Sequence, residues 1–247
     1  MANATFRVWR GTREKGEFVD YKTEVSEGMV VLDAIHQIQA ESAGDLAARW
    51  NCKAGKCGSC SAEINGMPKL MCMTRLDTVP LDRPVTVEPM RSFPLIKDLV
   101  TDVSWNFAVK KAIPKLKTRK PDAPDGTWRM QQEDVERVQE FRKCIECFLC
   151  QDVCHVLRNH ETERPFMGPR FLVRVAGLEM HPIDAADRTG YLREEGGIGF
   201  CNITKCCTKV CPEEIHITDN AIIPLKERVV DRFYDPVKRL FRVFGGG

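Results

Sequence analysis

Twelve cysteines, arranged in three groups of four, constrain this chain of 247 residues more than any other feature. The first group follows the pattern C-x4-C-x2-C, with a fourth cysteine after eleven further residues. This is the plant-type spacing for a 2Fe-2S cluster. The predicted ligands are Cys52, Cys57, Cys60 and Cys72. The spacing is that of iron-sulfur ligation rather than of disulfides or zinc, so the sequence predicts an electron-transfer protein.

The second and third groups follow the bacterial ferredoxin run C-x2-C-x2-C-x3-C, in which three cysteines hold one cubane and the fourth reaches a second cluster. The third group departs from this run because Thr204 stands where the middle ligand belongs. A neutral hydroxyl is a much poorer ligand for iron than a thiolate. The second group contains Cys144, Cys147, Cys150 and Cys154, and the third contains Cys201, Cys206, Cys207 and Cys211.

The exchange of fourth cysteines between the two runs assigns the remaining ligands. A 4Fe-4S cluster is expected on Cys144, Cys147, Cys150 and Cys211. The three cysteines left without a fourth, Cys154, Cys201 and Cys207, suit a 3Fe-4S cluster. Cys206 lies beside Cys207 and is left over. Two interpretations of Cys206 stay open: a buried free thiol, or a ligand that rebuilds a cubane.

Other chemistries for the cysteines are less compatible with the sequence. The first eleven residues carry no basic-then-apolar signal peptide, which argues against an extracellular disulfide framework. Zinc sites use paired C-x2-C knuckles, whereas the second run crowds three thiolates into one loop. A net charge of +2 and the lack of a long basic stripe with aromatics argue against a nucleic-acid module. No apolar stretch approaches the eighteen or so residues that span a bilayer.

Residue patterns predict a small sheet with one helix in the first hundred residues. Strands are expected at residues 6–9, 18–25 and 84–90. A helix ending near Ala40 is expected from apolar residues at helical spacing. The dipeptide Asn65-Gly66 predicts a tight hairpin turn that brings Cys72 back toward Cys60.

Three segments follow from these patterns: a 2Fe-2S domain over residues 1–104, a basic and proline-rich linker over 105–128, and a mainly helical domain over 129–247. Within the last, helices are expected at residues 134–141 and 169–179. A further helix is expected to begin at Asp235-Pro236, with Val237, Leu240, Phe241 and Phe244 on its apolar face.

The chain resembles the iron-sulfur subunits of succinate dehydrogenase and fumarate reductase (complex II) nearly from end to end. The similarity is carried by Cys52-Lys-Ala-Gly-Lys-Cys57-Gly-Ser-Cys60, Phe93-Pro-Leu-Ile-Lys-Asp-Leu-Val100, Cys144-Ile-Glu-Cys147 and Cys207-Thr-Lys-Val-Cys211-Pro212. The resemblance implies an α+β chain: a plant-type ferredoxin-like β-grasp domain, followed by an α-helical bacterial ferredoxin-like domain. The ligand assignment above matches that of the family.

The resemblance also implies a role and partners. Electrons would pass from the FAD of a flavoprotein subunit through the 2Fe-2S, 4Fe-4S and 3Fe-4S clusters toward quinone at a membrane-anchor subunit, as in the succinate oxidation of the tricarboxylic acid cycle. The chain would be an enzyme subunit with no substrate site, no catalytic residue and no transmembrane segment of its own. It would lie peripherally at the cytoplasmic face of a bacterial inner membrane. The direction, from succinate or toward fumarate, stays open, as does another substrate of the flavoprotein.

Two departures from the family concern quinone. A proline usually follows the fourth cysteine of the second group and a tryptophan lies a few residues later, whereas this chain has His155 and Asn159 there. A histidine often follows the first cysteine of the third group, where this chain has Asn202. We therefore expect the membrane partner to supply most quinone contacts, with His155 either a proton donor or a structural residue. A soluble ferredoxin-like carrier is the remaining alternative, although balanced charge argues against it.

Overall fold

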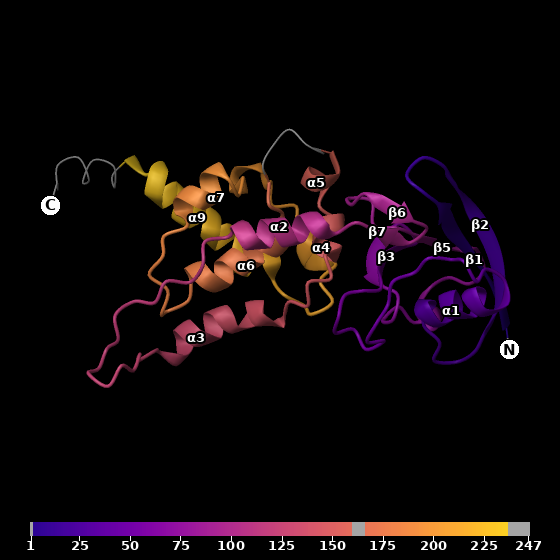
Figure 1. Cartoon of the computed structure of the whole chain (residues 1–247). Coiled ribbons are helices and arrows are strands. Elements are labelled where there is room, and N and C mark those ends of the chain that lie inside the picture. Colours follow the sequence, from indigo (N-terminus) through magenta and orange to yellow (C-terminus); the bar gives the residue numbers. More distant parts are fainter. Residues whose placement is uncertain (1, 160–165, 237–247) are drawn as a thin grey trace. The chain divides into compact units, whose positions relative to one another are not determined.

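The computed structural model describes residues 2–159 and 166–236 (Figure 1). It divides into two compact units. The N-terminal unit comprises residues 1–106, 145–154 and 210–213, and the C-terminal unit comprises residues 107–144, 155–209 and 214–247.

The N-terminal unit is built on a five-stranded sheet with the order β2-β1-β5-β3-β4. The two long strands β1 and β2 pair antiparallel, and β1 pairs parallel with β5. Alternation of side chains along β1 buries Ala4, Phe6 and Val8 on one face. The strands are β1 (Ala2–Gly11), β2 (Gly16–Val25), β3 (Ser61–Ile64), β4 (Met67–Leu70), β5 (Val85–Glu88), β6 (Leu95–Lys97) and β7 (Val100–Thr101).

One helix, α1 (Val31–Glu41), packs its apolar stripe on this sheet, as Figure 1 shows. Val31, Leu32, Ile35 and Ile38 are almost completely buried, which is the helical spacing that the sequence indicated. The sheet and helix confirm the predicted N-terminal ferredoxin-like domain.

The predicted Asn65-Gly66 turn joins β3 to β4. Asn65 has φ of 49° and Gly66 has φ of 76°, so both central residues adopt the left-handed conformation that a type I′ turn requires. Ile64 pairs with Met67 and Ser61 with Leu70. The hairpin therefore returns the chain to the cysteine loop, as expected.

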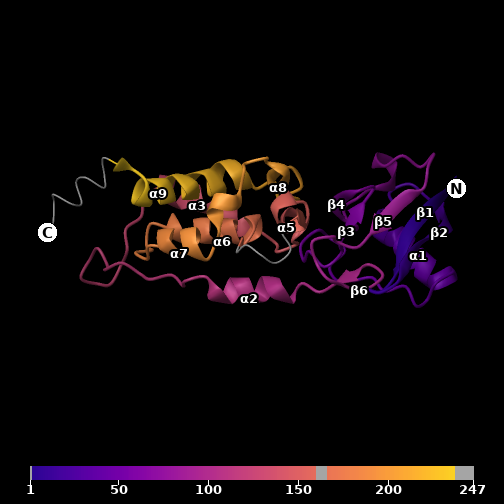
Figure 2. The same ribbon diagram turned by 90° about the horizontal axis from the view of Figure 1, so that it is seen from above.

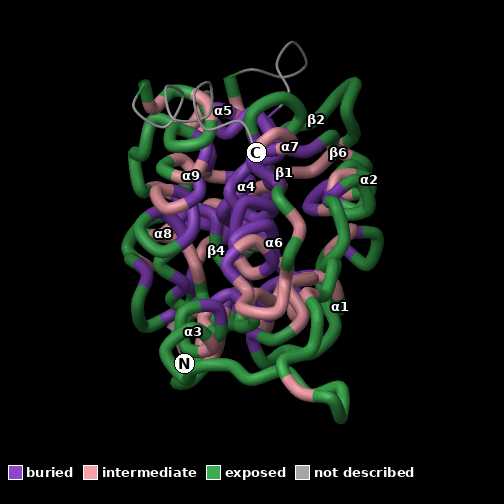
Figure 3. Tube along the Cα trace, turned by 90° about the vertical axis from the view of Figure 1, so that its left-hand side faces the viewer, coloured by how far each residue is buried: buried purple, intermediate pink, exposed green. Residues whose placement is uncertain are grey.

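The C-terminal unit is mainly helical, as predicted. Its centre is α6 (Pro169–Glu179), which has the predicted bounds and which Figure 3 marks as largely buried. Figure 2 shows α9 running beside α7. This unit also contains most of α2 (Ser104–Ala112), together with α3 (Gln132–Gln139), α5 (His155–Asn159), α7 (Thr189–Glu194), α8 (Cys206–Lys209) and α9 (Ile223–Phe233), whereas α4 (Leu149–Asp152) belongs to the N-terminal unit. A π-helix spans Ile217–Ile222, and 3-10 turns span Leu76–Thr78, Glu140–Lys143 and Ile198–Phe200.

The segment predicted to be a linker, residues 105–128, has more structure than its composition indicated. Its first third lies in α2, and Lys110 and Lys111 occupy the last helical turn, where the helix dipole favours cations. Farther on, hydrogen bonds from the Arg119 guanidinium and the Arg129 N–H lower the pKa of Asp122 to about 2. The indole N–H of Trp128 donates to the Arg119 carbonyl at 2.9 Å. These bonds fix the local conformation of the segment.

Two further predictions concern the remainder of the chain. Residues 145–154 were expected in the helical domain, but they group with the N-terminal unit because Cys147 and Leu149 are buried in its hydrophobic core. The apolar face predicted from Val237 onward lies outside the described residues. Within residues 2–159 and 166–236, no helix has the length and apolar character needed to cross a membrane.

Candidate iron-sulfur centres

The first cysteine loop turns its backbone N–H groups toward sulfur. The amides of Ala54 and Lys56 donate to the Cys52 Sγ at 3.4 and 3.3 Å, and the Cys52 amide donates to the Cys57 Sγ at 3.5 Å. Such donors stabilise negative charge on a ligand sulfur. Left-handed backbone at Lys53 and Gly55, with φ of 55° and 66°, produces the sharp turns that aim these amides inward.

The other two cysteines of the first group come from the sheet. Cys60 directly precedes β3 and Cys72 follows β4, and the Cys72 amide donates to the Cys60 Sγ at 3.5 Å. Burial, together with the neighbouring Cys72 and Cys57 sulfurs, raises the pKa of Cys60 to about 12. Burial opposes ionisation of Cys57 too, but hydrogen bonds from Ser59 and the Cys52 amide lower its pKa to about 6. Crowded thiols that can bind iron as thiolates, with inward amides that stabilise their negative charge, fit an iron-sulfur cluster.

Gly58 in this loop lies against the backbone of the second cysteine group. A Cβ atom on Gly58 would be 2.5 Å from the Cys147 Cα, closer than real contacts allow. The Ser61 hydroxyl shares its proton between the carbonyl oxygens of Gly58 and Cys147, at 2.9 and 2.8 Å. Within the N-terminal unit, the first and second cysteine loops are therefore in direct contact.

The second group lies at the start of α4 and beside it. Glu146 and Phe148 lie on either side of Cys147 and adopt left-handed φ values of 57° and 62°. This tight winding suits a loop that turns several thiols toward one point. Cys147, Cys150 and Cys154 are buried, and Cys144 is half-buried.

The cysteines predicted for the 4Fe-4S cluster are distributed between sequence segments far apart. Cys147, Cys150 and Cys211 all belong to the N-terminal unit. Lys56 of the first loop forms an ion pair with Glu213 at 3.1 Å, two residues after Cys211. Val210 packs against the same core. The grouping of Cys144 with these three stays a prediction from the spacing.

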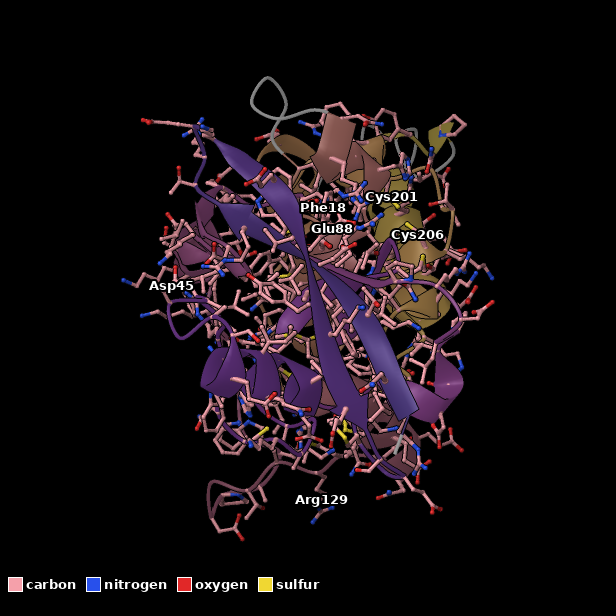
Figure 4. The ribbon with its side chains drawn as sticks, turned by 90° about the vertical axis from the view of Figure 1, so that its right-hand side faces the viewer. Phe18, Asp45, Glu88, Arg129, Cys201 and Cys206 are labelled. Atoms are coloured by element: carbon pink, nitrogen blue, oxygen red, sulfur yellow. The ribbon has the colours of Figure 1, made fainter. Side chains whose placement is uncertain are left out.

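The third group begins in the loop after the 3-10 turn at Ile198–Phe200, where Cys201 lies. Cys206 and Cys207 begin α8, and Cys211 follows that helix. Figure 4 labels Cys201 and Cys206, and the charges of both act on the Cys207 thiol, whose pKa is raised chiefly by burial. Ile203 and Lys205, on either side of Thr204, have left-handed φ values of 62° and 61°. The Thr204 hydroxyl donates to the Cys206 Sγ at 3.3 Å.

Two threonines lie near Cys207, and no sequence pattern predicts this position for either of them. The Thr218 hydroxyl, in the π-helix, lies 3.6 Å from the Cys207 Sγ. The Thr208 hydroxyl lies 3.0 Å from that of Thr218. Thr218 is the seventh residue after Cys211 in sequence, and no ligand pattern marks it.

The residues at the departures from the family pattern lie on α5 and in the loop of the third cysteine group. His155 begins α5 and is half-buried, and Asn159 ends the same helix and is exposed. Asn202 follows Cys201 and is exposed. The Nδ1 atom of His216 lies 2.8 Å from Glu140, whereas His36 forms an edge contact with the Trp50 ring. In the described residues, no three His, Cys, Asp or Glu side chains form a single-ion metal site.

Replacement of Thr204 tests the role given to its hydroxyl. In Thr204→Cys we expect the 3Fe-4S signal of the oxidised protein to disappear and a 4Fe-4S signal to replace it after reduction. The reason is that the new thiolate supplies the fourth ligand, at the cluster corner that is vacant in a 3Fe-4S cluster. Low-temperature electron paramagnetic resonance (EPR) with iron quantification measures this. Thr204→Ser is the matched control and should keep the 3Fe-4S signal. An unchanged spectrum in Thr204→Cys would show that position 204 does not face the vacant corner.

Comparisons with known proteins agree with this arrangement. Residues 5–108 match a family described as a 2Fe-2S iron-sulfur cluster binding domain, and residues 140–215 match a 4Fe-4S dicluster domain. These two ranges contain the three cysteine groups and support the α+β order of domains.

Complete relatives extend the similarity over most of the chain. The fumarate reductase iron-sulfur subunit of Mycobacterium tuberculosis is 34% identical over 202 residues, covering 80% of each chain. The succinate dehydrogenase iron-sulfur subunit of Bacillus subtilis is 30% identical over 190 residues, covering 73% of this chain and 71% of that one.

A solved structure is similar in both sequence and fold. A chain of the Mycobacterium smegmatis Sdh1 complex in the apo form is 61% identical, with a TM-score of 0.90 over 95% of this chain and 98% of that one. Together with the cysteine spacing, these similarities mean that the chain belongs to the family of iron-sulfur subunits of succinate dehydrogenase and fumarate reductase.

Proposed function

We propose that this chain is the electron-transfer subunit of a succinate:quinone oxidoreductase. It would receive electrons from the FAD of a flavoprotein subunit and deliver them toward quinone at a membrane-anchor subunit. The observation that carries the proposal is the direct packing of the first and second cysteine loops at Gly58 and Cys147. The similarity to the Sdh1 complex chain supports the succinate direction.

The cysteines that would hold the clusters are those assigned from the spacing. Each bound cluster would take up and pass on one electron at a time. Cys52, Cys57, Cys60 and Cys72 would hold the 2Fe-2S cluster. Cys144, Cys147, Cys150 and Cys211 would hold the 4Fe-4S cluster, and Cys154, Cys201 and Cys207 the 3Fe-4S cluster.

The protein's own contribution would be placement and tuning. The amides of Ala54 and Lys56 stabilise negative charge at Cys52. The close approach at Gly58 keeps the first two cysteine loops together, and burial of Cys147 and Cys150 excludes water from the second. As a peripheral subunit, the chain would lie at the cytoplasmic face of the inner membrane. Quinone contacts would come mostly from the membrane anchor.

Succinate addition to the assembled, air-oxidised complex tests this function. Two electrons and two protons leave succinate as fumarate forms, so we expect the oxidised 3Fe-4S signal to fall and a reduced 2Fe-2S signal to appear. Malonate, which resembles succinate but cannot be oxidised, is the control and should leave the spectrum unchanged. Persistence of the oxidised signal with succinate, although dithionite removes it, would contradict the proposal.

A quinol:fumarate reductase is the second candidate. The similarity to the Mycobacterium tuberculosis fumarate reductase subunit favours it. In that case, fumarate added to the dithionite-reduced complex should reoxidise the clusters faster than succinate reduces the oxidised ones. A faster reduction by succinate would favour the first candidate.

A further inference from the structure

A short chain of hydroxyl groups ends at the sulfur of Cys207. The Thr218 amide donates to the Thr208 Oγ1 at 3.0 Å. The Thr208 and Thr218 hydroxyls lie 3.0 Å apart, and the Thr218 Oγ1 lies 3.6 Å from the Cys207 Sγ. Cys207, Thr208 and Thr218 all belong to the C-terminal unit, so this geometry is internal to one compact body.

Burial and neighbouring contacts fix the position of Thr218. Only 1% of its surface is exposed, and Cys207 is buried beside it. The π-helix that carries Thr218 is held at its start by Glu140, which accepts hydrogen bonds from the His216 amide at 2.7 Å and from Asn220 at 2.5 Å. On the other side, Lys205 pairs with Asp219 at 2.7 Å. The hydroxyl is therefore held in place rather than free to follow the sulfur.

Ligation determines the direction of the hydrogen bonds. A free Cys207 thiol could donate to Thr218, but a thiolate bound to iron has no proton and can only accept. The Thr218 hydroxyl must then donate to the Cys207 Sγ, which leaves its oxygen to accept from the Thr208 hydroxyl. Thr208 in turn accepts from the Thr218 amide. All donors then point along one path, and each bond polarises the next.

We propose that Thr218 is a positioning residue whose hydroxyl, oriented by Thr208, donates a hydrogen bond to the Cys207 thiolate and raises the reduction potential of the 3Fe-4S cluster. The inference rests on the proposed function, because it requires Cys207 to be a ligand. The reduced state of a cluster carries one more negative charge than the oxidised state. A hydrogen bond to a ligand sulfur stabilises the more negative state, and hydrogen bonding to sulfur is one of the factors that set cluster potentials.

The test is a redox titration of the assembled complex, followed by the 3Fe-4S EPR signal. Thr218→Val removes the hydroxyl and keeps the shape of the side chain. We expect the signal to keep its full intensity while the equilibrium constant for one-electron reduction falls about tenfold, which is about 59 mV. Thr218→Ser should restore the wild-type potential. The 2Fe-2S potential, measured in the same samples, should not change.

Thr189→Val is a matched control. Thr189 is also buried in the C-terminal unit, and its hydroxyl donates to Asp187 at 2.5 Å rather than to a cysteine. Its loss should leave both potentials unchanged. A Thr218→Val protein with the full 3Fe-4S signal and a wild-type potential would overturn the proposal.

Thr208→Val keeps the inference testable if Thr218→Val fails to retain the cluster. It leaves the donor in place and removes the group that orients it, so we expect a smaller shift to lower potential. A wild-type potential in Thr208→Val would then refute the inference. A wild-type complex without any 3Fe-4S signal refutes the cluster assignment itself, which is a different result and visible before any variant is made.

Discussion

Gly58→Ala is expected to destabilise the N-terminal unit by ~2–5 kcal/mol. Gly58 has φ of 67°, a conformation that costs an alanine energy by itself. The new Cβ would also lie 2.5 Å from the Cys147 Cα and 2.9 Å from its backbone nitrogen. Backbone atoms cannot move aside as a flexible side chain can, so the two cysteine loops must separate. The Ser61 hydroxyl would then lose one of its two carbonyl partners.

Denaturant unfolding of the assembled complex, followed by the visible absorbance of the clusters, measures this effect, together with iron per chain. Gly66→Ala is the matched control because Gly66 also has positive φ, 76°, but its Cβ would meet nothing within 4 Å. The free energy of unfolding of that variant should fall only by the ~1–2 kcal/mol that positive φ costs an alanine, and the variant should keep its iron. Equal losses in the two variants would show that the contact between Gly58 and Cys147 has no energetic role.

Arg188→Met should destabilise the C-terminal unit by about 3–5 kcal/mol. The Arg188 side chain is completely buried and pairs with Asp184 at 2.7 Å and with Glu179 at 3.5 Å. It also donates to the carbonyl oxygens of Pro114 and Lys115, both at 2.9 Å. Methionine fills much of the space but removes the guanidinium that pairs with both buried carboxylates. Removal of one partner from a buried ion pair is costly for this reason.

The pH dependence of this variant provides a second readout. Burial already raises the pKa of Glu179, and loss of the guanidinium removes attractions that oppose this effect. When the pKa of a carboxyl group is higher in the folded than in the unfolded state, the ionised group destabilises the folded protein at pH values above the unfolded-state pKa. Protonation of the carboxylate removes this destabilisation. The loss in free energy of unfolding caused by Arg188→Met should therefore become smaller as the pH falls from 7 toward 5. Arg7→Met, which breaks an exposed pair with Asp20, should show a much smaller loss. Comparable losses would contradict the account of Arg188.

Much of this architecture follows from local rules that the sequence displays. The Asn65-Gly66 turn and the helix at residues 169–179 are set by short-range chemistry, namely positive φ and apolar periodicity. The cysteine groups can be recognised in the sequence because a cluster needs several thiols in a small volume, and short loops place these thiols at fixed spacing.

Features set by tertiary packing were not visible in the sequence. The basic composition of residues 105–128 indicated a linker, yet the bonds of Arg119 and Arg188 give this segment definite structure. The assignment of residues 145–154 to the N-terminal unit depends on where Cys147 and Leu149 are buried. No sequence pattern marks Thr218, because the role proposed for it depends on a contact with Cys207, eleven positions earlier in the chain.

Low-temperature EPR of the assembled complex, air-oxidised and then reduced with dithionite, tests the central claim most directly when iron and zinc are quantified on the same sample. We predict an oxidised 3Fe-4S signal, 2Fe-2S and 4Fe-4S signals after reduction, and no stoichiometric zinc. An oxidised sample with full cubane iron but no 3Fe-4S signal would make Cys206 a ligand and contradict the assignment at Thr204. Zinc in place of iron would contradict the electron-transfer function itself.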